Sequence, residues 1–489
     1  MSMVVQHNMQ AANANRMLGI TSGAQAKSTE KLSSGYKINR AADDAAGLTI
    51  SEKMRKQIRG LDKASSNAQD GVSSVQTAEG ALTEVHSMLQ RMNELAVQAA
   101  NGTNSKDTDR KAIQDEIDQL NTEIDRVAET TKFNEIYLLK GDDGEKTVNM
   151  NAHDAGLKGT LTDNGDGTAT FKMDTLNAGD TVSIGGKNYT IGGEAADVTD
   201  MLTKAGITDA AGDKVTINGK EYTYCENASD GKTALTHKGY YETAPDTANA
   251  ATANPAYADS AAIAAAKSAT ISVGTKSITT IDDTKKADGI DDNDTSVITK
   301  QKAYELAGKE LLAANQIGDT EGNAEVKNGD KTDLAYNAGD GTFNIKVGQA
   351  KVANTLSFSL HVGADADMTN KITVDIETMN SANLGIKGLN VTDKNGSAAT
   401  YAIDAISDAI SKVSSQRSAL GAVQNRLEHT IDNLDNISEN TSSAESRIRD
   451  TDMAKEMVNY SKNNILAQAG QSMLAQANQS NQGVLSLLQ

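Results

Sequence analysis

Residues 61–100 read LDKASSNAQDGVSSVQTAEGALTEVHSMLQRMNELAVQAA, and this stretch decides the fold. Apolar or small residues recur in it every three or four positions, at Leu61, Ala64, Ala68, Gly71, Val75, Ala78, Leu82, Val85, Leu89, Met92, Ala96 and Ala99. This spacing places them along one face of an α-helix, as in the seam of a coiled coil. Such a helix would be roughly 58 Å long. Because a single narrow apolar stripe does not stabilise a helix in water, we expect partner helices to cover it.

Two further segments carry the same spacing and are the predicted partners. The first has Ile113, Ile117, Leu120, Ile124 and Val127, and the second has Ile403, Ile406, Ile410, Val413, Leu420, Val423, Leu427, Ile431 and Leu434. Arg417 interrupts the second seam, which leaves its register open. Between the first two helices, residues 101–104 predict a helix end and a turn. The expected core is a helical bundle to which both ends of the chain contribute.

The composition favours an elongated helical protein over a compact globule. The chain has 489 residues, of which only 3% are aromatic and none is Trp. Its formal net charge is −19, so nucleic acid is not an expected partner. The single cysteine, Cys225, excludes an intramolecular disulfide. Residues 1–10 lack the pattern of a signal peptide, and no stretch approaches the ~20 apolar residues of a membrane span, so we expect neither signal-peptide cleavage nor membrane insertion.

The centre of the chain differs in composition from both ends. It is rich in Gly, Thr and Asp and contains the only two prolines, Pro245 and Pro255. Residues 180–190 and 213–223 align position for position, and each reads as a strand, a Gly-Gly or Asn-Gly turn and a returning strand. A short helix is expected at 195–205, and a looser copy of the hairpin at 271–279. These features predict β–β–α modules in a β-rich insertion.

The two ends of the chain predict a self-association surface. Residues 8–18 and 464–488 are amphipathic, almost uncharged and rich in Gln, Asn, Ala and Met, and residues 483–489 (GVLSLLQ) are apolar. Frayed termini would carry more charge and fewer aliphatic residues. A monomer would expose this apolar surface, which marks an association site. The candidate self-assembly residues are Met9, Leu18, Ile465, Leu466, Met473, Leu474, Val484, Leu485, Leu487 and Leu488.

No motif in the chain predicts catalysis, a cofactor or a metal site. The histidines are scattered without the spacing of metal ligands. There is no His-Glu-x-x-His motif and no phosphate-binding glycine loop. Residues 163–167 resemble a calcium loop only faintly, and a hairpin turn explains them better. We therefore expect no catalytic residues, no cofactor and no metal.

Both arms of the chain carry distinctive motifs, among them residues 31–39 (KLSSGYKIN), 40–48 (RAADDAAGL), 89–98 (LQRMNELAVQ), 444–452 (AESRIRDTD) and 473–478 (MLAQAN). In these motifs the sequence of both arms resembles that of bacterial flagellins, of the clostridial type. The resemblance covers roughly the first 140 and the last 135 residues. Two departures stand out: Glu135 occupies a turn position where many flagellins have Gly, and Gln489 replaces a common terminal Arg.

The resemblance implies a fold that is mostly α. It would be a rod of long, coiled-coil-like helices from both termini with a short β element at 356–386, plus a central α+β, β-rich variable insertion. The implied segments are 1–40, the inner helix that lines the filament lumen; 41–145, the outer helical domain; 146–354, the variable insertion; 355–445, the rest of the outer domain; and 446–489, the C-terminal inner helix.

A joint between the inner and outer domains is predicted at residues 33–47. Ser33, Ser34, Gly35 and Gly47 interrupt the helix there. Arg40 precedes Asp43 and Asp44 by three and four residues, so a local ion pair would brace the joint. A surface pair of little energetic value explains the same spacing equally well.

The resemblance also implies partners. They are other copies of the chain in a helical homopolymer, an export chaperone that binds the C-terminal helix, the hook-associated junction and cap proteins, and the host Toll-like receptor that recognises flagellins. The matching receptor positions are Leu89, Gln90, Arg91, Glu94, Leu95 and Glu116, and we expect Arg91→Ala with Leu95→Ala to lower receptor binding. The implied location is the extracellular flagellum, reached through the flagellar export apparatus. Residues 8–18 and 464–488, the tips of the chain, are expected to be disordered until neighbouring subunits bury them.

Three alternative functions compete with that of a major filament subunit. A hook–filament junction protein shares the terminal helices, but the intact runs at 43–48 and 89–98 favour the filament subunit. An enzyme in the centre would show clustered His, Cys or carboxylates, which the centre lacks. An adhesin needs only surface loops, so glycan or protein binding by the insertion stays open.

Overall fold

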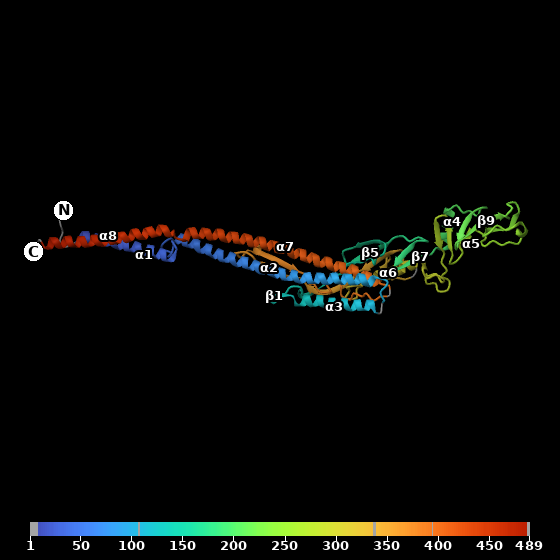
Figure 1. The fold of residues 1–489 in the computed structure, drawn as a ribbon, viewed down its shortest axis with the longest axis horizontal. Coiled ribbons are helices and arrows are strands. Elements are labelled where there is room, and N and C mark those ends of the chain that lie inside the picture. Colours follow the sequence, from blue (N-terminus) through green and yellow to red (C-terminus); the bar gives the residue numbers. More distant parts are fainter. Residues whose placement is uncertain (1–7, 106–107, 336–338, 394, 487–489) are drawn as a thin grey trace. The chain divides into compact units, whose positions relative to one another are not determined.

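The computed structural model describes residues 8–105, 108–335, 339–393 and 395–486, with side chains up to Ser480. The chain divides into two compact units, one made of 1–75, 358–374 and 421–489 and the other of 76–357 and 375–420. The long helices are α1 (Met9–Ser34), α2 (Ala45–Ala100), α3 (Asp109–Thr130), α7 (Ser397–Arg449) and α8 (Met453–Ser486) (Figure 1). Long helices from both termini and a β-rich centre confirm the predicted fold class. The predicted boundaries of the five segments stay a prediction.

Helix α2 carries the predicted seam, and every seam residue from Leu61 to Ala99 is buried. Its main partner is α7, in which Ile406, Val413, Leu420, Leu427 and Leu434 are buried at intervals of seven residues. This heptad spacing keeps one face of each helix against the other. The prediction that Arg417 interrupts the seam is wrong. Gln416 lies on the buried face instead, and its side-chain amide donates to the Asp375 carbonyl oxygen at 3.0 Å.

Helix α3 lies against the same bundle within the second unit. Its residues Ile113, Ile117, Ile124 and Ala128 are buried, whereas the predicted Leu120 and Val127 are only half-buried. The predicted helix end at 101–104 is confirmed, since α2 stops at Ala100. The buried Arg110 side chain donates to the carbonyl oxygens of Ala99 (2.8 Å) and Asn101 (3.3 Å). A cation at a helix C-terminus satisfies carbonyl groups that the helix itself cannot.

The predicted β element is a hairpin of β17 (Leu356–His361) and β18 (Lys371–Ile376), joined through the short helix η2 (Met368–Asn370). In the first unit, Val362 and Ile372 pack on Ala68 of α2 and Leu427 of α7. A Cβ atom on Gly71 would lie 2.2 Å from the Leu360 side chain, so the glycine leaves room for the hairpin to pack against α2. This contact completes the helical core.

The central insertion begins and ends as an antiparallel ribbon of β3 (Asp142–Asn149) and β16 (Gln349–Asn354). A four-stranded sheet has the order β14-β15-β5-β4, and a three-stranded sheet has the order β13-β7-β6. These strands are β4 (Gly159–Asp163), β5 (Thr168–Met173), β6 (Thr181–Ile184), β7 (Lys187–Ile191), β13 (Val297–Ile298), β14 (Glu325–Asn328) and β15 (Thr342–Lys346). Helix α6 (Lys300–Asn315) shares one core with both sheets, around Phe171, Phe343 and Tyr304.

The outer part of the insertion is a five-stranded sheet of order β10-β9-β8-β11-β12. Its elements are β8 (Lys214–Ile217), β9 (Lys220–Asn227), β10 (Ala234–Tyr241), β11 (Thr270–Val273) and β12 (Lys276–Thr279), with α4 (Ala195–Lys204), α5 (Ser260–Ala264) and η1 (Thr247–Asn249). The α4 residues Val198, Met201 and Leu202 pack on Val215 and Ile217 of this sheet.

All three predicted hairpins are present, and so is the predicted turn between β4 and β5. Gly185 and Gly186 have φ of 56° and 71°, and Asn218 and Gly219 have φ of 52° and 81°. Two successive positive φ angles are the signature of the two-residue hairpin turn that Gly-Gly and Asn-Gly favour. The prediction that a hairpin and the helix after it pack together as a β–β–α module is wrong. The two aligned hairpins lie in different sheets, and α4 packs on the second of them rather than on the one it follows.

None of the helices in the described part of the chain is long and apolar enough to cross a membrane.

Candidate functional site

The candidate assembly surface lies on α1 and α8, which run side by side in the first unit (Figure 1). Many contacts run along the pair, and two of them are specific. The Asn8 amide donates to the Ala477 carbonyl oxygen at 3.2 Å, and Leu18 lies against Gly470. Among the described side chains, α1 buries only Ser28, and α8 buries none. The pair therefore has almost no core of its own.

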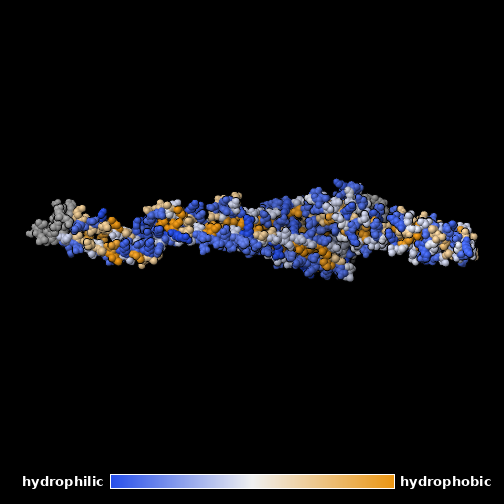
Figure 2. All heavy atoms as spheres, turned by 90° about the horizontal axis from the view of Figure 1, so that it is seen from above, coloured by the Kyte–Doolittle hydropathy of each residue, from blue (hydrophilic) through white to orange (hydrophobic). Residues whose placement is uncertain are grey.

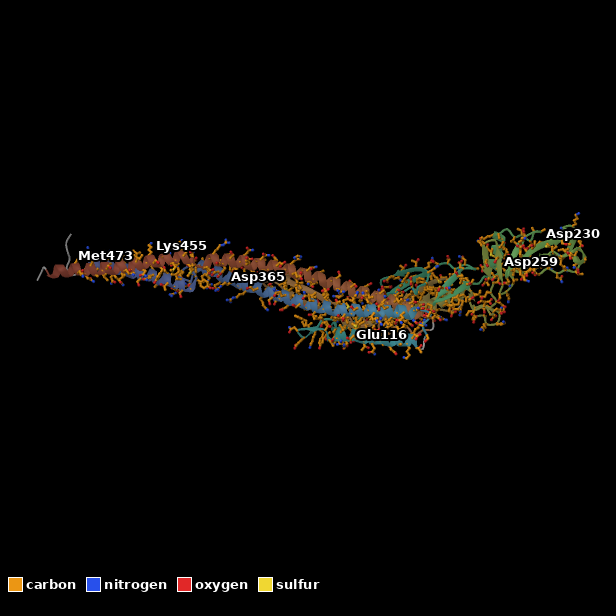
Figure 3. All side chains as sticks on the ribbon, viewed as in Figure 1. Glu116, Asp230, Asp259, Asp365, Lys455 and Met473 are labelled. Carbon is orange, nitrogen blue, oxygen red and sulfur yellow. The ribbon has the colours of Figure 1, made fainter. Side chains whose placement is uncertain are left out.

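The predicted tip residues lie mostly on the outside of this pair. Met9, Ile465, Leu466 and Met473 are exposed, Ile465 to 67%, and Leu18 and Leu474 are half-buried. Figure 3 shows Met473 on α8, and Figure 2 shows hydrophobic surface along the two helices. The side chains of Val484 and Leu485, and all of Leu487 and Leu488, lie outside the described part of the chain.

The structure adds residues to the tip surface that the sequence reasoning missed. Met17, Ile20, Met453, Met457 and Val458 are also large, apolar and exposed. Val458 and Ile465 are seven residues apart, as are Leu466 and Met473. This heptad spacing could have identified the α8 residues. An open groove of about 730 Å³ runs between the helices, lined by residues that include Met17, Leu18, Leu466, Gly470 and Met473.

The predicted joint lies between α1 and α2, beside the break between α7 and α8. Helix α1 ends at Ser34, and Gly35 adopts φ of 74°, which places its N–H on the Lys31 carbonyl oxygen. The exposed Ser34 hydroxyl accepts the N–H of Tyr36, while Ser33 is exposed. The predicted interruption by Gly47 is wrong, because α2 begins at Ala45 and runs through it.

Gly47 serves close packing at the start of α2. Its N–H donates to the Asp44 carboxylate at 2.8 Å, which caps the helix. A Cβ atom at Gly47 would lie 2.5 Å from Asp44 Oδ2 and 2.8 Å from the buried Ile38 side chain. The glycine therefore lets the joint segment fold back on the first turn of α2.

The predicted ion pair between Arg40 and Asp43 or Asp44 is also wrong. Arg40 Nε pairs with Glu30 of α1 at 2.9 Å. Asp43 instead accepts the backbone N–H groups of Arg40 (3.0 Å) and Asn39 (3.3 Å). These bonds, that of Arg40 foremost, hold the pKa of Asp43 below its ordinary value. The acid braces the backbone of the joint, whereas Arg40 fastens the joint to α1.

The predicted receptor positions divide into an exposed charged cluster and buried apolar residues, all in the second unit. Arg91 Nε and Nη2 contact Glu116 at 2.9 Å, and Nη1 contacts Glu94 at 3.2 Å. The hydrogen bonds that Arg91 donates to Glu116 and, to a lesser degree, to Glu94 raise the pKa of Arg91. Glu116 lies on α3 (Figure 3) and is exposed, and Gln90 is exposed beside His86. Leu89 is buried in the seam, and Leu95 is only 2% exposed.

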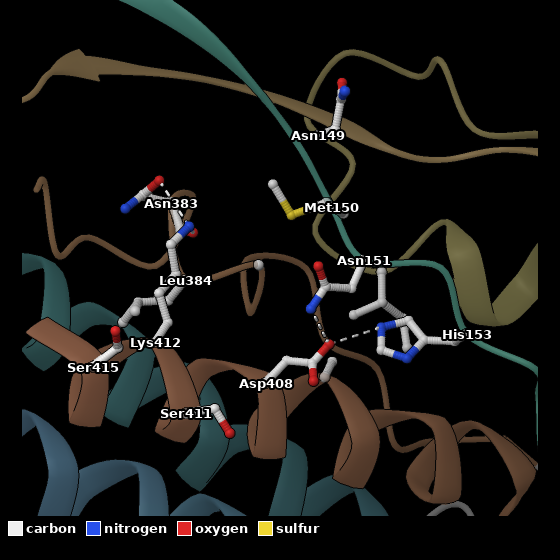
Figure 4. A pocket seen from close by; sticks show the side chains of 13 residues that line it. Asn149, Met150, Asn151, His153, Asn383, Leu384, Asp408, Ser411, Lys412 and Ser415 are labelled. Carbon is white, nitrogen blue, oxygen red and sulfur yellow. Dashed lines mark hydrogen bonds and ion pairs between the residues drawn. The ribbon is translucent and has the colours of Figure 1, made fainter. Parts of the chain in front are cut away.

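A polar cavity of about 370 Å³ lies beside α7 in the second unit (Figure 4). Lys412 Nζ donates to the carbonyl and side-chain oxygens of Asn383, at 2.7 and 3.1 Å. The amide of Asn151 donates to Asp408 at 2.8 Å. Burial lowers the pKa of Lys412. These contacts fasten the segment around Asn383 and the end of β3 to α7. Among the described residues, no cluster of His, Cys, Asp or Glu could hold a metal ion.

Comparison with known proteins places both arms in one family. Residues 5–143 match the bacterial flagellin N-terminal helical region, and residues 403–488 match the bacterial flagellin C-terminal helical region. A flagellin of Clostridium tyrobutyricum is 38% identical over 98% of this chain and 100% of its own length. The chain belongs to the bacterial flagellin family. A flagellin of Bacillus subtilis (strain 168) is 34% identical over 99% of this chain and 100% of its own length.

Membership of this family fixes the general role. Flagellins are structural proteins rather than enzymes, so this flagellin is a subunit of the bacterial flagellar filament, an extracellular assembly. Both matched regions include candidate tip residues, while residues 144–402, which hold most of the insertion, lie outside the two matches.

A solved structure described as FliC from Burkholderia pseudomallei also matches. It is 16% identical and covers 73% of this flagellin and 99% of that chain, with a TM-score of 0.25. This overlap is too low to support any argument about the fold.

Proposed function

We propose that this flagellin polymerises through the apolar surface of α1 and α8, which is buried only when neighbouring subunits cover it. The observation that carries the proposal is the contrast between helix pairs. The α2–α7 seam is buried within one chain, whereas Met9, Ile465 and Met473 face solvent. Burying a side chain of this size contributes about 1.5–3 kcal/mol. A row of them along two helices supplies a large driving force for association.

Deleting residues 465–489 tests this proposal. The truncated chain keeps the whole α2–α7 seam, so we expect a soluble monomer with unchanged unfolding of the bundle that does not extend filament fragments. Negative-stain electron microscopy of seeded samples measures the outcome. Met473→Ser is the point variant, and Met368→Ser, an exposed methionine on η2, is its matched control. Normal filaments from the truncated chain would contradict the proposal.

The same surface suits the other partners that we propose for it. Before export, an export chaperone binds α8 and covers Ile465, Leu466 and Met473, which would otherwise promote premature association. At the filament ends, the hook-associated junction and cap proteins contact the tips that no further subunit covers. Export through the flagellar export apparatus and disorder of the tips before assembly belong to the same proposal. The named relatives are flagellins over their full length, which favours the filament subunit over a junction protein.

We also propose that the cluster of Arg91, Glu94, Glu116 and Gln90 contacts the flagellin-recognising Toll-like receptor. The exposed guanidinium between two carboxylates offers charged, directional hydrogen-bond donors and acceptors on adjacent helices. Leu89 and Leu95 lie beneath this cluster in the packed seam. Their contribution is to hold Arg91 in place.

Replacing Arg91 alone separates contact from packing. Arg91→Ala leaves the seam intact, and we expect it to weaken binding of the monomer to the receptor at least about tenfold, as for a central charged contact. Arg126→Ala is the matched control, because Arg126 is also exposed and pairs with a carboxylate, Glu123, within α3. Surface plasmon resonance with purified receptor measures both. Equal affinities of Arg91→Ala and the unmodified chain would rule out this contact.

A further inference from the structure

The ends of α1, α2, α7 and α8 meet at a single point in the first unit. Here the segment after α1 runs beside the segment between α7 and α8. The Lys37 N–H donates to the Arg449 carbonyl oxygen at 2.6 Å, and the Thr451 N–H donates to the Gly35 carbonyl oxygen at 3.0 Å. Tyr36 and Asp450 form an antiparallel bridge between these bonds. The segment between α1 and α2 and the segment between α7 and α8 are therefore paired with each other like two short antiparallel strands.

The Tyr36 ring is the centre of this connection. The Arg449 guanidinium carbon lies 4.7 Å from the ring centroid, and that of Arg55 lies 5.8 Å from it. A guanidinium over an aromatic face is attracted by the ring, most strongly where water is excluded. The Arg449 side chain is only 13% exposed. Tyr36 therefore holds one cation from α2 and one from α7.

Two carboxylates complete the cluster, and each pairs across the two helices. Arg449 of α7 contacts Glu52 of α2 at 2.6 Å, and Arg55 of α2 contacts Glu445 of α7 at 3.6 Å. The same side chains are spaced for pairing within one helix, since Glu52 and Arg55 are three residues apart and Glu445 and Arg449 four. With both guanidinium groups over one ring, the pairing runs between α2 and α7 instead.

We propose that Tyr36 is a positioning residue for filament assembly. By fastening the end of α1 to the start of α8, it sets the register in which the two tip helices present their apolar residues to a second copy of this chain. This inference rests on the proposed role of the α1–α8 surface and assigns the residue that aligns it.

Few other specific contacts fix the alignment of α1 with α8. Along their length, α1 and α8 bury only Ser28 among the described side chains. Apart from the hydrogen bond from Asn8 to Ala477 and the contact of Leu18 with Gly470, their packing therefore does little to stop one helix from sliding along the other. A slip by one residue moves a helix by about 1.5 Å and turns its side chains by about a quarter of a turn. Each such register would present the heptad rows on α8 differently to a neighbouring copy. The connection at Tyr36, where α1 ends and α8 begins, holds the two helices in one register before a second copy binds.

Tyr36→Ala, Tyr36→Leu and Tyr36→Phe in the full-length chain test the proposal. Alanine removes the ring, leucine keeps apolar volume without an aromatic face, and phenylalanine keeps the face. We expect the critical concentration for seeded growth to rise about tenfold for alanine and leucine, the size of one strong cation–aromatic contact. Phenylalanine should stay within about twofold of the unmodified chain. Tyr189→Ala, which removes a ring over which Lys187 lies at 4.9 Å in the insertion, is the matched control and should change nothing.

Hydrogen exchange of the monomer provides the second readout. The amides of Lys37 and Thr451 should exchange faster in Tyr36→Ala and Tyr36→Leu, and at unchanged rates in Tyr36→Phe and Tyr189→Ala. Amides in the α2–α7 seam should not change. This measurement reports on the connection even if a variant does not polymerise.

The outcomes separate this inference from the assembly surface itself. If Met473→Ser abolishes growth while Tyr36→Ala grows normally, the surface is supported and the positioning role is overturned. If Met473→Ser grows normally, the surface is wrong, and the hydrogen-exchange result alone decides whether Tyr36 fastens α1 to α8. Unchanged exchange at Lys37 and Thr451 in Tyr36→Ala overturns the inference whatever the filaments do.

Discussion

Glu135 shows how a single residue stores strain in an otherwise ordinary turn. It lies with Asn134 between β1 (Lys132–Phe133) and β2 (Ile136–Tyr137), a hairpin in the second unit. Both turn residues have positive φ, 46° for Asn134 and 68° for Glu135. Asn tolerates this conformation, whereas a residue such as Glu incurs a steric cost of roughly 1–2 kcal/mol. The turn keeps the geometry that a glycine would favour, although the sequence departs from glycine there.

Glu135→Gly should therefore stabilise this hairpin by about 0.5–1 kcal/mol, the steric relief less the extra chain entropy of glycine. The Leu138 N–H, which donates to the Thr131 carbonyl oxygen and closes the hairpin, reports on it. Its hydrogen exchange should slow about two- to fivefold. Asn134→Gly is the control and should have a smaller effect. Faster or unchanged exchange in Glu135→Gly would show that the turn is not strained.

At the scale of helices, one chain uses the same structure in two ways. Helices α2 and α7 bury a continuous seam and are stable by their own packing. Helices α1 and α8 instead expose large apolar residues such as Met9, Ile465 and Met473. Ser28 is the only side chain that they bury among those described. The difference is one of partners rather than of helix propensity. The exposed apolar stripe of such a helix is a site at which another molecule can bind.

Leu427→Ala and Ile465→Ala should separate these two roles. Leu427 is fully buried in the α2–α7 core, so its truncation should lower the free energy of unfolding of the monomer by about 2–5 kcal/mol. Ile465 is 67% exposed, so its truncation should change monomer stability by less than about 0.5 kcal/mol. Urea denaturation measures both.

Seeded growth should show the reverse sensitivity. At a temperature where both monomers are folded, Ile465→Ala should raise the critical concentration and Leu427→Ala should leave it nearly unchanged. A loss of monomer stability in Ile465→Ala would mean that the residue belongs to the folded core.

At the scale of the whole molecule, charge opposes association. With 47 Lys and Arg against 66 Asp and Glu, each copy carries a formal net charge of −19. Like-charged copies repel over about 30 Å at 10 mM salt but only about 10 Å at 100 mM. The tip surface itself is nearly uncharged, so salt should reduce the repulsion without weakening the apolar contacts.

The critical concentration for seeded growth should therefore fall when NaCl is raised from about 10 to 150 mM. Sedimentation of filaments at equilibrium measures the remaining monomer. Met473→Ser should start from a higher critical concentration and fall with salt by about the same factor, because its net charge is unchanged. A critical concentration that rises with salt would indicate that ion pairs, rather than apolar burial, hold the subunits together.

Much of the fold could be predicted from the sequence, because its signals are local. The seam from Leu61 to Ala99 follows from spacing along one helix, and the hairpins at 184–187 and 217–220 follow from which residues accept positive φ. The exposed tip residues follow likewise from apolar side chains in segments with almost no charge. These properties depend on residues within a few positions of one another, and no distant contact reverses them.

Only the tertiary structure decided which distant residues meet. Arg40 has two carboxylates close by in sequence, yet it pairs with Glu30, because the joint folds back along α1. Arg417 was expected to break the seam, yet Gln416 takes the buried position because Asp375 is there to accept its hydrogen bond. The cluster around Tyr36 is assembled from residues some 400 positions apart in a chain of 489. Periodicity determines which face of a helix is apolar, but the partner of each charged or aromatic side chain depends on how the two arms are brought together in space.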